Sequence, residues 1–363
     1  MEELGVKEAF AGAFAGRRIL VTGHTGFKGS WLCAWLERLG ADVTGLALAP
    51  DTSPSHWALL GLREVRSHHV DLADKAGIEK VVAGCEPELI FHLAAQSLVR
   101  RSYLEPLATF ETNVMGLVRL LEVVRDRKRP AAIINVTTDK VYRPPAPASG
   151  YAESNALGGH DPYSASKACA ELVSESWRAS WLEEAGVRLA TARAGNVIGG
   201  GDWARDRLIP DLVRAAISDA ATPLRNPTAV RPWQHVLEPL AGYLCLARSL
   251  LQGAEHACAW NFGPRTGDHL SVEAVAQLAS LSWPSIRCKP DPGPHPHEAA
   301  ELRLDSSKAH DQLGWQPIWE AREAIDRTIS WYRNWYAERV LGTHDDIAAY
   351  CAQARSLGLS WAR

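Results

Sequence analysis

Short apolar runs alternate with longer segments of helical periodicity through the first half of the chain. The β-prone run Arg18–Thr22 is bounded by glycine and predicts a strand. From Trp31 to Leu39 apolar residues recur at a helical spacing, and Gly40 is placed to end that helix. The same patterns predict strands at 43–47, 89–93, 131–136 and 187–192, and helices at 107–125, 163–181 and 320–335. Because strands alternate with helices, we expect an α/β fold with a doubly wound parallel sheet.

The chain becomes less regular past Gly195. A glycine run at 199–201 and prolines at 210, 223, 227 and 232 interrupt regular structure, and the proline-rich segment Cys288–Pro296 predicts a loop. We therefore expect a Rossmann-type cofactor domain over residues 1–194, to which the chain returns near 232–262. Residues 195–363 are expected to form mainly a smaller substrate-binding domain.

Composition places the chain in the ordinary globular class, since 46% of its 363 residues are hydrophobic and 22% are charged. A net charge of -3 gives no basic surface for nucleic acid or an anionic membrane. The N-terminus lacks the pattern of a signal peptide, and no apolar stretch is long enough to span a bilayer. The seven cysteines are scattered, which is typical of reduced thiols in a cytoplasmic protein.

Three glycines at a Gly-x-x-Gly-x-x-Gly spacing lie between the first predicted strand and the first predicted helix. Glycine there permits a tight turn and lets the backbone approach a pyrophosphate at the helix N-terminus. We expect a dinucleotide to be bound by Gly23, Thr25, Gly26, Phe27, Lys28 and Gly29.

The identity of the dinucleotide depends on the residues after the second strand. An NAD site often has an acid at that strand's end, whereas here Asp51 comes only afterwards. No arginine is present there either, so nothing is in place for a 2′-phosphate, and we expect NAD. Asp71 and Leu72, after a further expected strand, are candidates for contacting the adenine. An ordinary loop aspartate is the alternative for Asp71.

Tyr163 and Lys167 are one helical turn apart and therefore point from the same face of a helix. A phenol is a poor base at neutral pH, but a nearby ammonium and a cationic nicotinamide both favour the phenolate. Tyr163 can then take the proton of a sugar hydroxyl. Such a pair also occurs in ordinary helices, yet its place after the glycine turn and Thr137 favours catalysis.

Asp139 and Lys140 come after the predicted strand 131–136, at the edge where open α/β sheets bind ligands. An acid and an amine beside the tyrosine suit an enzyme that removes a hydride, expels water and returns the hydride. The alternative for this pair is a surface salt bridge.

Together these motifs resemble the extended short-chain dehydrogenase/reductase family, over about Arg17 to Trp335. Further matches are His92 to Gln96, Thr112 to Val114 and Leu313 to Pro317. Longer stretches are similar to the branch of this family that acts on CDP-glucose, namely 21–31, 138–142, 158–163, 193–203 and 231–236. The loop Tyr151–Asn155 matches that branch less well.

The resemblance implies conversion of CDP-D-glucose to CDP-4-dehydro-6-deoxy-D-glucose and water with NAD. Tyr163 would take the C4 hydroxyl proton, Lys167 would support the phenolate and hold the ribose, and Thr137 would hydrogen-bond the C4 oxygen. Asp139 would protonate the C6 hydroxyl, and Lys140 would be the C5 base or would stabilise the enolate. Related dTDP-sugar dehydratases carry Asp-Glu at these two positions.

The resemblance also implies further contacts and an assembly. Cofactor contacts are expected at Leu93, Ala94, Ala95 and Asn113, and substrate contacts at Gln96, Thr138, Asn196, Trp203 and Arg231. A homodimer is expected through the helices at 107–125 and 163–181. The aromatic residues Trp331, Tyr332 and Trp335 are interpreted as core.

Two other functions remain open at this point. A nucleotide-sugar 4-epimerase or decarboxylase uses the same tyrosine, lysine and glycine turn, but it does not need an acid and an amine after the two threonines. A non-catalytic NAD-binding protein is the second alternative, although such proteins commonly lose the tyrosine or the lysine. His68-His69 and His295-x-His297 lack acid or cysteine ligands at a useful spacing, so we expect no metal.

Overall fold

A seven-stranded parallel sheet forms the centre of the protein in a computed structural model, which describes residues 6–129, 131–291, 293 and 303–363. The strand order is β11-β6-β5-β4-β1-β2-β3, and each neighbouring pair is parallel. The strands are β1 (Arg18–Thr22), β2 (Asp42–Ala47), β3 (Arg66–His69), β4 (Leu89–His92), β5 (Ala131–Val136), β6 (Val187–Ala194) and β11 (Ala259–Phe262).

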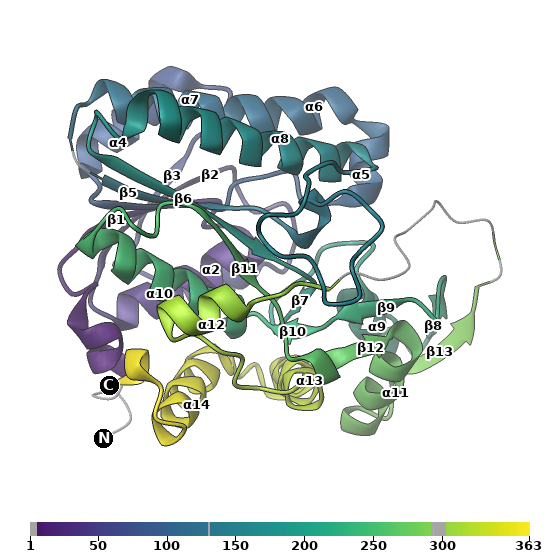
Figure 1. The fold of residues 1–363 in the computed structure, drawn as a ribbon. Coiled ribbons are helices and arrows are strands. Elements are labelled where there is room, and N and C mark those ends of the chain that lie inside the picture. The colour runs from purple at the N-terminus through teal and green to yellow at the C-terminus, as the bar shows by residue number, and fades with distance from the viewer. Residues whose placement is uncertain (1–5, 130, 292, 294–302) are drawn as a thin grey trace.

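Helices cover both faces of this sheet, which confirms the doubly wound α/β prediction (Figure 1). Successive residues of a strand point to opposite faces, so Leu20 joins one apolar core and Ile19 and Val21 join the other. One core lies beneath α4 (Lys75–Cys85), α7 (Gly116–Asp126) and α8 (Pro162–Trp177). The other lies against α2 (Phe27–Arg38) and α10 (Leu237–Gln252).

The helix predicted at 107–125 is divided in the structure. It consists of α6 (Pro106–Phe110), a π-helical turn η2 (Glu111–Met115) and α7. A second π-helical turn, η4 (Arg178–Leu182), continues α8. The widened turn η2 contains Asn113, whose side chain is buried and points to the end of β4. Such turns are frequent where a helix positions a functional side chain.

Residues after β6 build a smaller region at the carboxyl edge of the sheet. Three two-stranded ladders support it, namely β7 (Val197–Ile198) with β10 (Gln234–His235), β9 (Val230–Pro232) with β12 (His269–Ser271), and β8 (Ala221–Leu224) with β13 (Arg287–Pro290). The helices α9 (Leu208–Ile217) and α11 (Val272–Ser282) pack on them.

The loop predicted at Cys288–Pro296 is wrong for its first part, because Cys288 to Pro290 belong to β13. A proline is tolerated in a strand where its nitrogen is not needed as a donor, and this two-stranded ladder consists only of edges. Positions 292 and 294–296 lie outside the described residues, as do His295 and His297.

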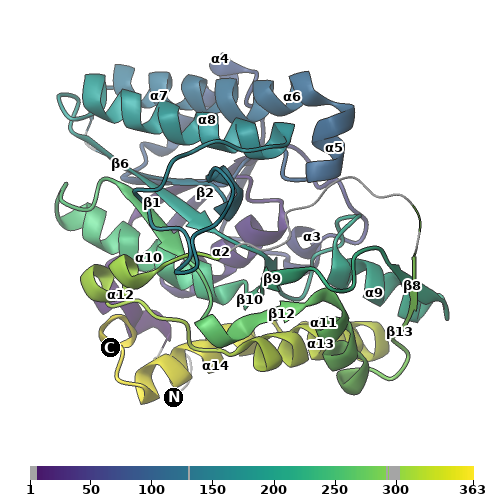
Figure 2. The same ribbon diagram turned by 45° about the vertical axis from the view of Figure 1, so that its right-hand side comes forward.

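The C-terminal helices pack below the α2 and α10 face (Figure 2). They are α12 (Ser307–Leu313), α13 (Ala321–Glu338) and α14 (Thr343–Ser356). Trp331, Tyr332 and Trp335 on α13 are buried, which confirms their prediction as core residues. The remaining elements are η1 (Ala9–Gly12), α3 (His56–Leu60), α5 (Val99–Leu104), η3 (Asp139–Val141), η5 (Thr266–Asp268) and η6 (Ser360–Ala362). Within the described ranges, no helix has the length and apolar character needed to cross a membrane.

Candidate active site

The glycine turn between β1 and α2 leaves bare backbone next to the end of β4. Gly23 has a φ of 74°, and a Cβ at this position would lie 2.7 Å from the backbone nitrogen of Ala94. A Cβ on Gly29 would lie 2.1 Å from the carbonyl oxygen of Gly23, so only glycine fits. Leu93, Ala94 and Ala95 therefore adjoin the turn. This cradle, at the N-terminus of α2, has the form that a dinucleotide pyrophosphate requires.

The side chains around the turn have distinct surroundings. The Thr25 hydroxyl donates to the carbonyl of Leu48 at 2.9 Å, which fixes the turn against the end of β2. The ring of Phe27 is half-buried near Gly199. The amine of Lys28 lies 5.9 Å from the centre of the Tyr243 ring, and burial lowers the pKa of this amine to about 7.

Asp71 and Leu72, the two residues predicted to contact the adenine, differ in the exposure of their side chains. Asp71 is exposed, and one of its carboxylate oxygens accepts a hydrogen bond from the backbone of Ala73. The side chain of Leu72 is instead buried in the core against Gly116. Any contact from Leu72 is therefore made by its backbone.

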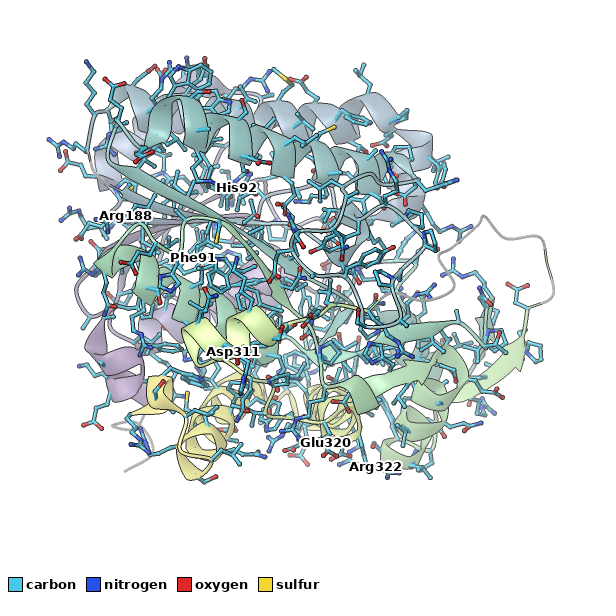
Figure 3. All side chains as sticks on the ribbon, in the orientation of Figure 1. Phe91, His92, Arg188, Asp311, Glu320 and Arg322 are labelled. Atoms are coloured by element: carbon cyan, nitrogen blue, oxygen red, sulfur yellow. The ribbon has the colours of Figure 1, made fainter. Side chains whose placement is uncertain are left out.

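Two buried side chains at strand ends, Thr22 and His92, support the turn from below. The Thr22 hydroxyl and His92 Nδ1 are 2.8 Å apart and connect β1 to β4. In Figure 3 His92 is labelled above the sheet and its neighbour Phe91 below it. Burial lowers the pKa of His92 to about 3, so the ring is neutral. A neutral ring lets the glycine turn rest on the sheet without a buried charge.

Tyr163 and Lys167 lie on the same buried face of α8, as their spacing predicts. Asp161 caps this helix by accepting from the backbone of Ser164 at 2.9 Å. Burial raises the pKa of Tyr163 to about 12, against a hydrogen bond with the Thr138 side chain that lowers it. Burial lowers the pKa of Lys167 to about 8, against the nearby Glu171 carboxylate.

The two threonines after β5 face different partners, and this corrects the prediction for Thr137. The Thr137 hydroxyl is buried and donates to Glu171, away from the tyrosine. The Thr138 side chain is the one that hydrogen-bonds Tyr163. Adjacent residues in extended backbone point to opposite sides, so only one of the two can face the phenol.

Asp139 and Lys140 lie together in the short turn η3. Asp139 is 1% exposed, and its Oδ1 accepts from the Thr138 hydroxyl at 3.0 Å. Its Oδ2 is buried without a hydrogen-bond partner among the described residues, next to Gly195. Lys140 Nζ lies 3.8 Å from Asp139 Oδ1 and stays partly exposed. The carboxyl is therefore interior, which excludes a surface salt bridge.

Two predicted substrate residues flank this carboxyl. A Cβ on Gly195 would lie 2.9 Å from Asp139 Oδ2 and 2.8 Å from the ring of Pro232, so Gly195 lies against both the acid and Pro232. Asn196 is next to Gly195 in the chain and is half-buried. Arg231 precedes Pro232 on β9, is buried, and donates to the carbonyl of Val230.

Two residues predicted to contact a ligand, Gln96 and Asn113, have their amides hydrogen-bonded within the protein. The Gln96 side chain bonds the backbone of Leu98 through both its nitrogen and its oxygen, and it also donates to Thr109. The Asn113 amide donates to Gln96 and to Ser166 and accepts from the Gln96 backbone. Both residues shape the segment that follows β4.

Trp203, a predicted substrate contact, packs against the aromatic residues of α13. Its ring packs edge-on against Trp331, Tyr332 and Trp335 on α13, and its indole nitrogen donates to the Tyr336 hydroxyl. The side chain is buried. This packing accounts for Trp203 without a nucleotide.

Arg207 belongs to the site but was not recognised in the sequence. Its guanidinium bonds Asp202 at 2.8 Å and the Ser97 hydroxyl at 3.1 Å. Its positive charge lowers the pKa of Tyr163. Asp202 lies within the matched stretch 193–203, but only the fold places Arg207 beside the tyrosine.

No group of three or more His, Cys, Asp or Glu side chains suited to a metal ion occurs in the described part of the chain. His68 and His69 lie on the exposed edge strand β3.

The chain is similar to several characterised proteins. It is 47% identical to the CDP-glucose 4,6-dehydratase of Salmonella typhimurium, covering 88% of this chain and 91% of the relative. It is 26% identical to a dTDP-glucose 4,6-dehydratase of Escherichia coli over 87% of this chain and 94% of the relative. Among solved structures, a dTDP-glucose 4,6-dehydratase variant of Streptomyces venezuelae, crystallised with NAD, covers 87% of this chain and 96% of its own. It has a TM-score of 0.74 and 26% identity.

The match extends through the region that carries the site. The family described as GDP-mannose 4,6 dehydratase matches residues 20–328, from β1 to α13. That span contains the glycine turn, the Thr138–Lys140 segment and the Tyr163/Lys167 pair. The chain therefore belongs to the GDP-mannose 4,6 dehydratase family, within the extended short-chain dehydrogenases/reductases.

Proposed function

We propose that the protein is an NAD-dependent nucleotide-sugar 4,6-dehydratase that converts CDP-D-glucose to CDP-4-dehydro-6-deoxy-D-glucose and water. The observation that carries this proposal is the buried Asp139 carboxyl, with the Lys140 amine 3.8 Å away, beside the Tyr163 hydroxyl. The 47% identity to a CDP-glucose 4,6-dehydratase supports the choice of nucleotide and sugar.

The residues around the glycine turn fit a dinucleotide. Gly23 and Gly29 leave no room for a Cβ, and the backbone nitrogens of Phe27 and Lys28 begin α2. Bound NAD supplies a hydride acceptor for C4, a donor for C6, and a positive ring charge that favours the phenolate. Asp71 is our candidate for the adenosine end.

Tyr163 removes the proton of the C4 hydroxyl in this proposal. Thr138 takes the role predicted for Thr137, since its side chain meets the phenol and can orient the C4 oxygen. Lys167 donates to the carbonyl of Val136 at 3.0 Å, which holds its charge beside the phenolate. Arg207 adds a second positive charge that stabilises the same anion.

Asp139 and Lys140 divide the elimination between them. A ketone at C4 acidifies the C5 proton, which passes to the neutral amine of Lys140. The electron pair of the C5–H bond forms the enolate and then the C5=C6 double bond as the C6–O bond breaks. Asp139 donates a proton to the C6 hydroxyl, so that water departs. Its Oδ2 is free to do this because the described residues leave it without a partner. An epimerase needs neither group.

The nucleotide end of the substrate is assigned to the residues after β6. We propose that Asn196 and Arg231 hold the diphosphate, since an amide and a guanidinium both donate to phosphate oxygens. Asn196 follows Gly195, which lies against Asp139, and Arg231 precedes Pro232, which lies against Gly195. Residues 1–194 with β11 then hold the cofactor, and most of 195–363 holds the nucleotide sugar.

A homodimer in the cytoplasm completes the proposal. Apolar side chains remain exposed along α5, α6, η2, α8 and η4, namely Tyr103, Leu104, Leu107, Met115, Leu172 and Trp181. Leu104 and Leu107 are 83% and 82% exposed, which is unusual for leucines that are not covered by a partner. The seven cysteines are free, in keeping with a reducing compartment.

Mass spectrometry after incubation with CDP-glucose and NAD tests the function. A dehydratase gives a product lighter by one water, an epimerase leaves the mass unchanged, and a non-catalytic protein gives no product. Unchanged mass together with an altered sugar configuration would sink the proposal.

A further inference from the structure

A buried carboxylate on α8 has no part in the proposed reaction. Glu171 lies one helical turn after Lys167, and its side chain is 3% exposed. Its Oε1 accepts from the Thr137 hydroxyl, and its Oε2 accepts from the Thr191 hydroxyl at 2.6 Å and from Arg193 at 2.8 Å. One carboxylate thus joins α8 to β5 and β6.

Arg193 carries the connection further. Its Nη1 donates to the Tyr142 hydroxyl at 2.7 Å and to the carbonyl of Glu153 at 3.1 Å. Tyr142 in turn donates to Asn261 on β11 at 2.7 Å. The ion pair between Glu171 and Arg193 is therefore bonded on both sides.

Glu171 and Arg193 bond the two ends of the segment 137–142, Glu171 through Thr137 and Arg193 through Tyr142. Thr137 precedes Thr138, Asp139 and Lys140, and Tyr142 comes after them. Resting on the proposed function, we infer that the buried Glu171–Arg193 pair positions this catalytic segment against Tyr163 and Lys167. Neither Glu171 nor Arg193 touches the reacting atoms, so both are positioning residues.

Buried charges suit this role because their geometry is restrictive. A buried ion pair contributes little net stability, since removing two charges from water offsets their attraction. A pair whose hydrogen bonds are satisfied nevertheless favours one arrangement of its neighbours. Small displacements matter here, because a shift of about 1 Å in a catalytic group can reduce a rate about a hundredfold.

Glu171 also acts on the charge of Lys167. The groups that face Lys167 are Tyr163 and Glu171 on its own helix, His92 on β4 and Lys28 at the start of α2. His92 is neutral, and Lys28 is cationic or neutral, so neither adds negative charge. Glu171 is the carboxylate that raises the pKa of Lys167 against burial. Its loss should deprotonate Lys167 at a lower pH. The charged residues Asp139 on η3 and Arg193 on β6 are not changed by the substitutions at Glu171.

Single hydroxyl deletions test the positioning. Thr137→Val and Tyr142→Phe each release one end of the segment, and we expect each to lower kcat at least about tenfold while KM and NAD affinity hold. Thr328→Val and Tyr350→Phe are matched controls, because each removes one buried hydroxyl bond far from the segment. The double variant should lose about as much as the worse single variant, since releasing one end already frees the segment. The inference would be overturned if the losses of kcat in the two single variants multiplied in the double variant. It would also be overturned if the single variants lost no more kcat than the controls.

Charge and shape are separated at Glu171 itself. Glu171→Gln should move the alkaline limb of the pH–kcat profile to lower pH. Glu171→Asp keeps the charge but is too short to reach both partners, so it should keep the limb and lower kcat. An unshifted alkaline limb in Glu171→Gln would refute the effect of the Glu171 charge on Lys167. A shifted limb in Glu171→Asp would refute it as well, and this variant decides alone if Glu171→Gln does not fold. Wild-type protein that forms no dehydrated product contradicts the proposed function instead, and that control is run first.

Discussion

Asp139→Asn is the most direct test of the chemistry proposed for the site. The substitution keeps an oxygen that can accept from Thr138, but it removes the proton that the C6 hydroxyl needs. General acid catalysis contributes about 10² to 10⁴ in rate, so water loss should fall by that factor, or about 3 to 5 kcal/mol of activation free energy. C4 oxidation should persist, because the substitution leaves Tyr163 and the Thr138 side chain that hydrogen-bonds it unchanged.

The two half-reactions are followed separately in a single turnover with CDP-glucose. Absorbance of the reduced nicotinamide reports C4 oxidation, and mass spectrometry reports the loss of water. We expect reduced cofactor to accumulate together with a 4-keto sugar that keeps its C6 hydroxyl. Asp311→Asn on α12 is the control, because this carboxylate is exposed and its ion-pair partner is the neighbouring His310 (Figure 3). Undiminished water loss in Asp139→Asn would refute the role of this residue.

Three further predictions concern the cofactor cradle, the phenol and the core. Gly29→Ala should abolish NAD binding in calorimetry, since its Cβ would lie 2.1 Å from a turn carbonyl, whereas Gly84→Ala, with nothing within 4 Å, should not. Thr138→Val should move the acid limb of the C4-oxidation profile to higher pH, because it removes the bond that lowers the pKa of Tyr163. Burial raises the pKa of Glu238 from 4.5 to about 7, so its contribution to stability is present below about 4.5 and is lost as pH rises through about 7. The Tm of wild type minus that of Glu238→Gln should therefore fall across this window.

Each of these has a contrary outcome. Normal NAD affinity in Gly29→Ala would show that the pyrophosphate lies elsewhere. An acid limb that does not move in Thr138→Val would show that Thr138 does not lower the pKa of Tyr163. A Tm difference that rises with pH for Glu238→Gln would mean that this carboxyl is not held in its protonated form.

Local spacing explains why the fold and the placement of several candidate site residues could be predicted. The periods of strands and helices lie in neighbouring residues, so β1, α2 and the common face of Tyr163 and Lys167 can be read from the chain alone. The same holds for the glycine turn, where a positive φ and the absence of a Cβ are properties of single residues. The loop expected at Cys288 failed because its ladder partner, β8, is more than 60 residues away in the chain.

Tertiary contacts decided which side chains the site uses. Thr137 and Thr138 are identical in type and adjacent, and only the packing of α8 against β5 gives the first to Glu171 and the second to Tyr163. Arg207 joins the site, and the Gln96 amide bonds Thr109, through partners that no local pattern specifies. The sequence by itself determined the sheet, the cofactor turn and the kinds of group available for catalysis, because short-range periodicity encodes them. The arrangement of those groups around one sugar depends on contacts between distant segments, and these exist only in the folded chain.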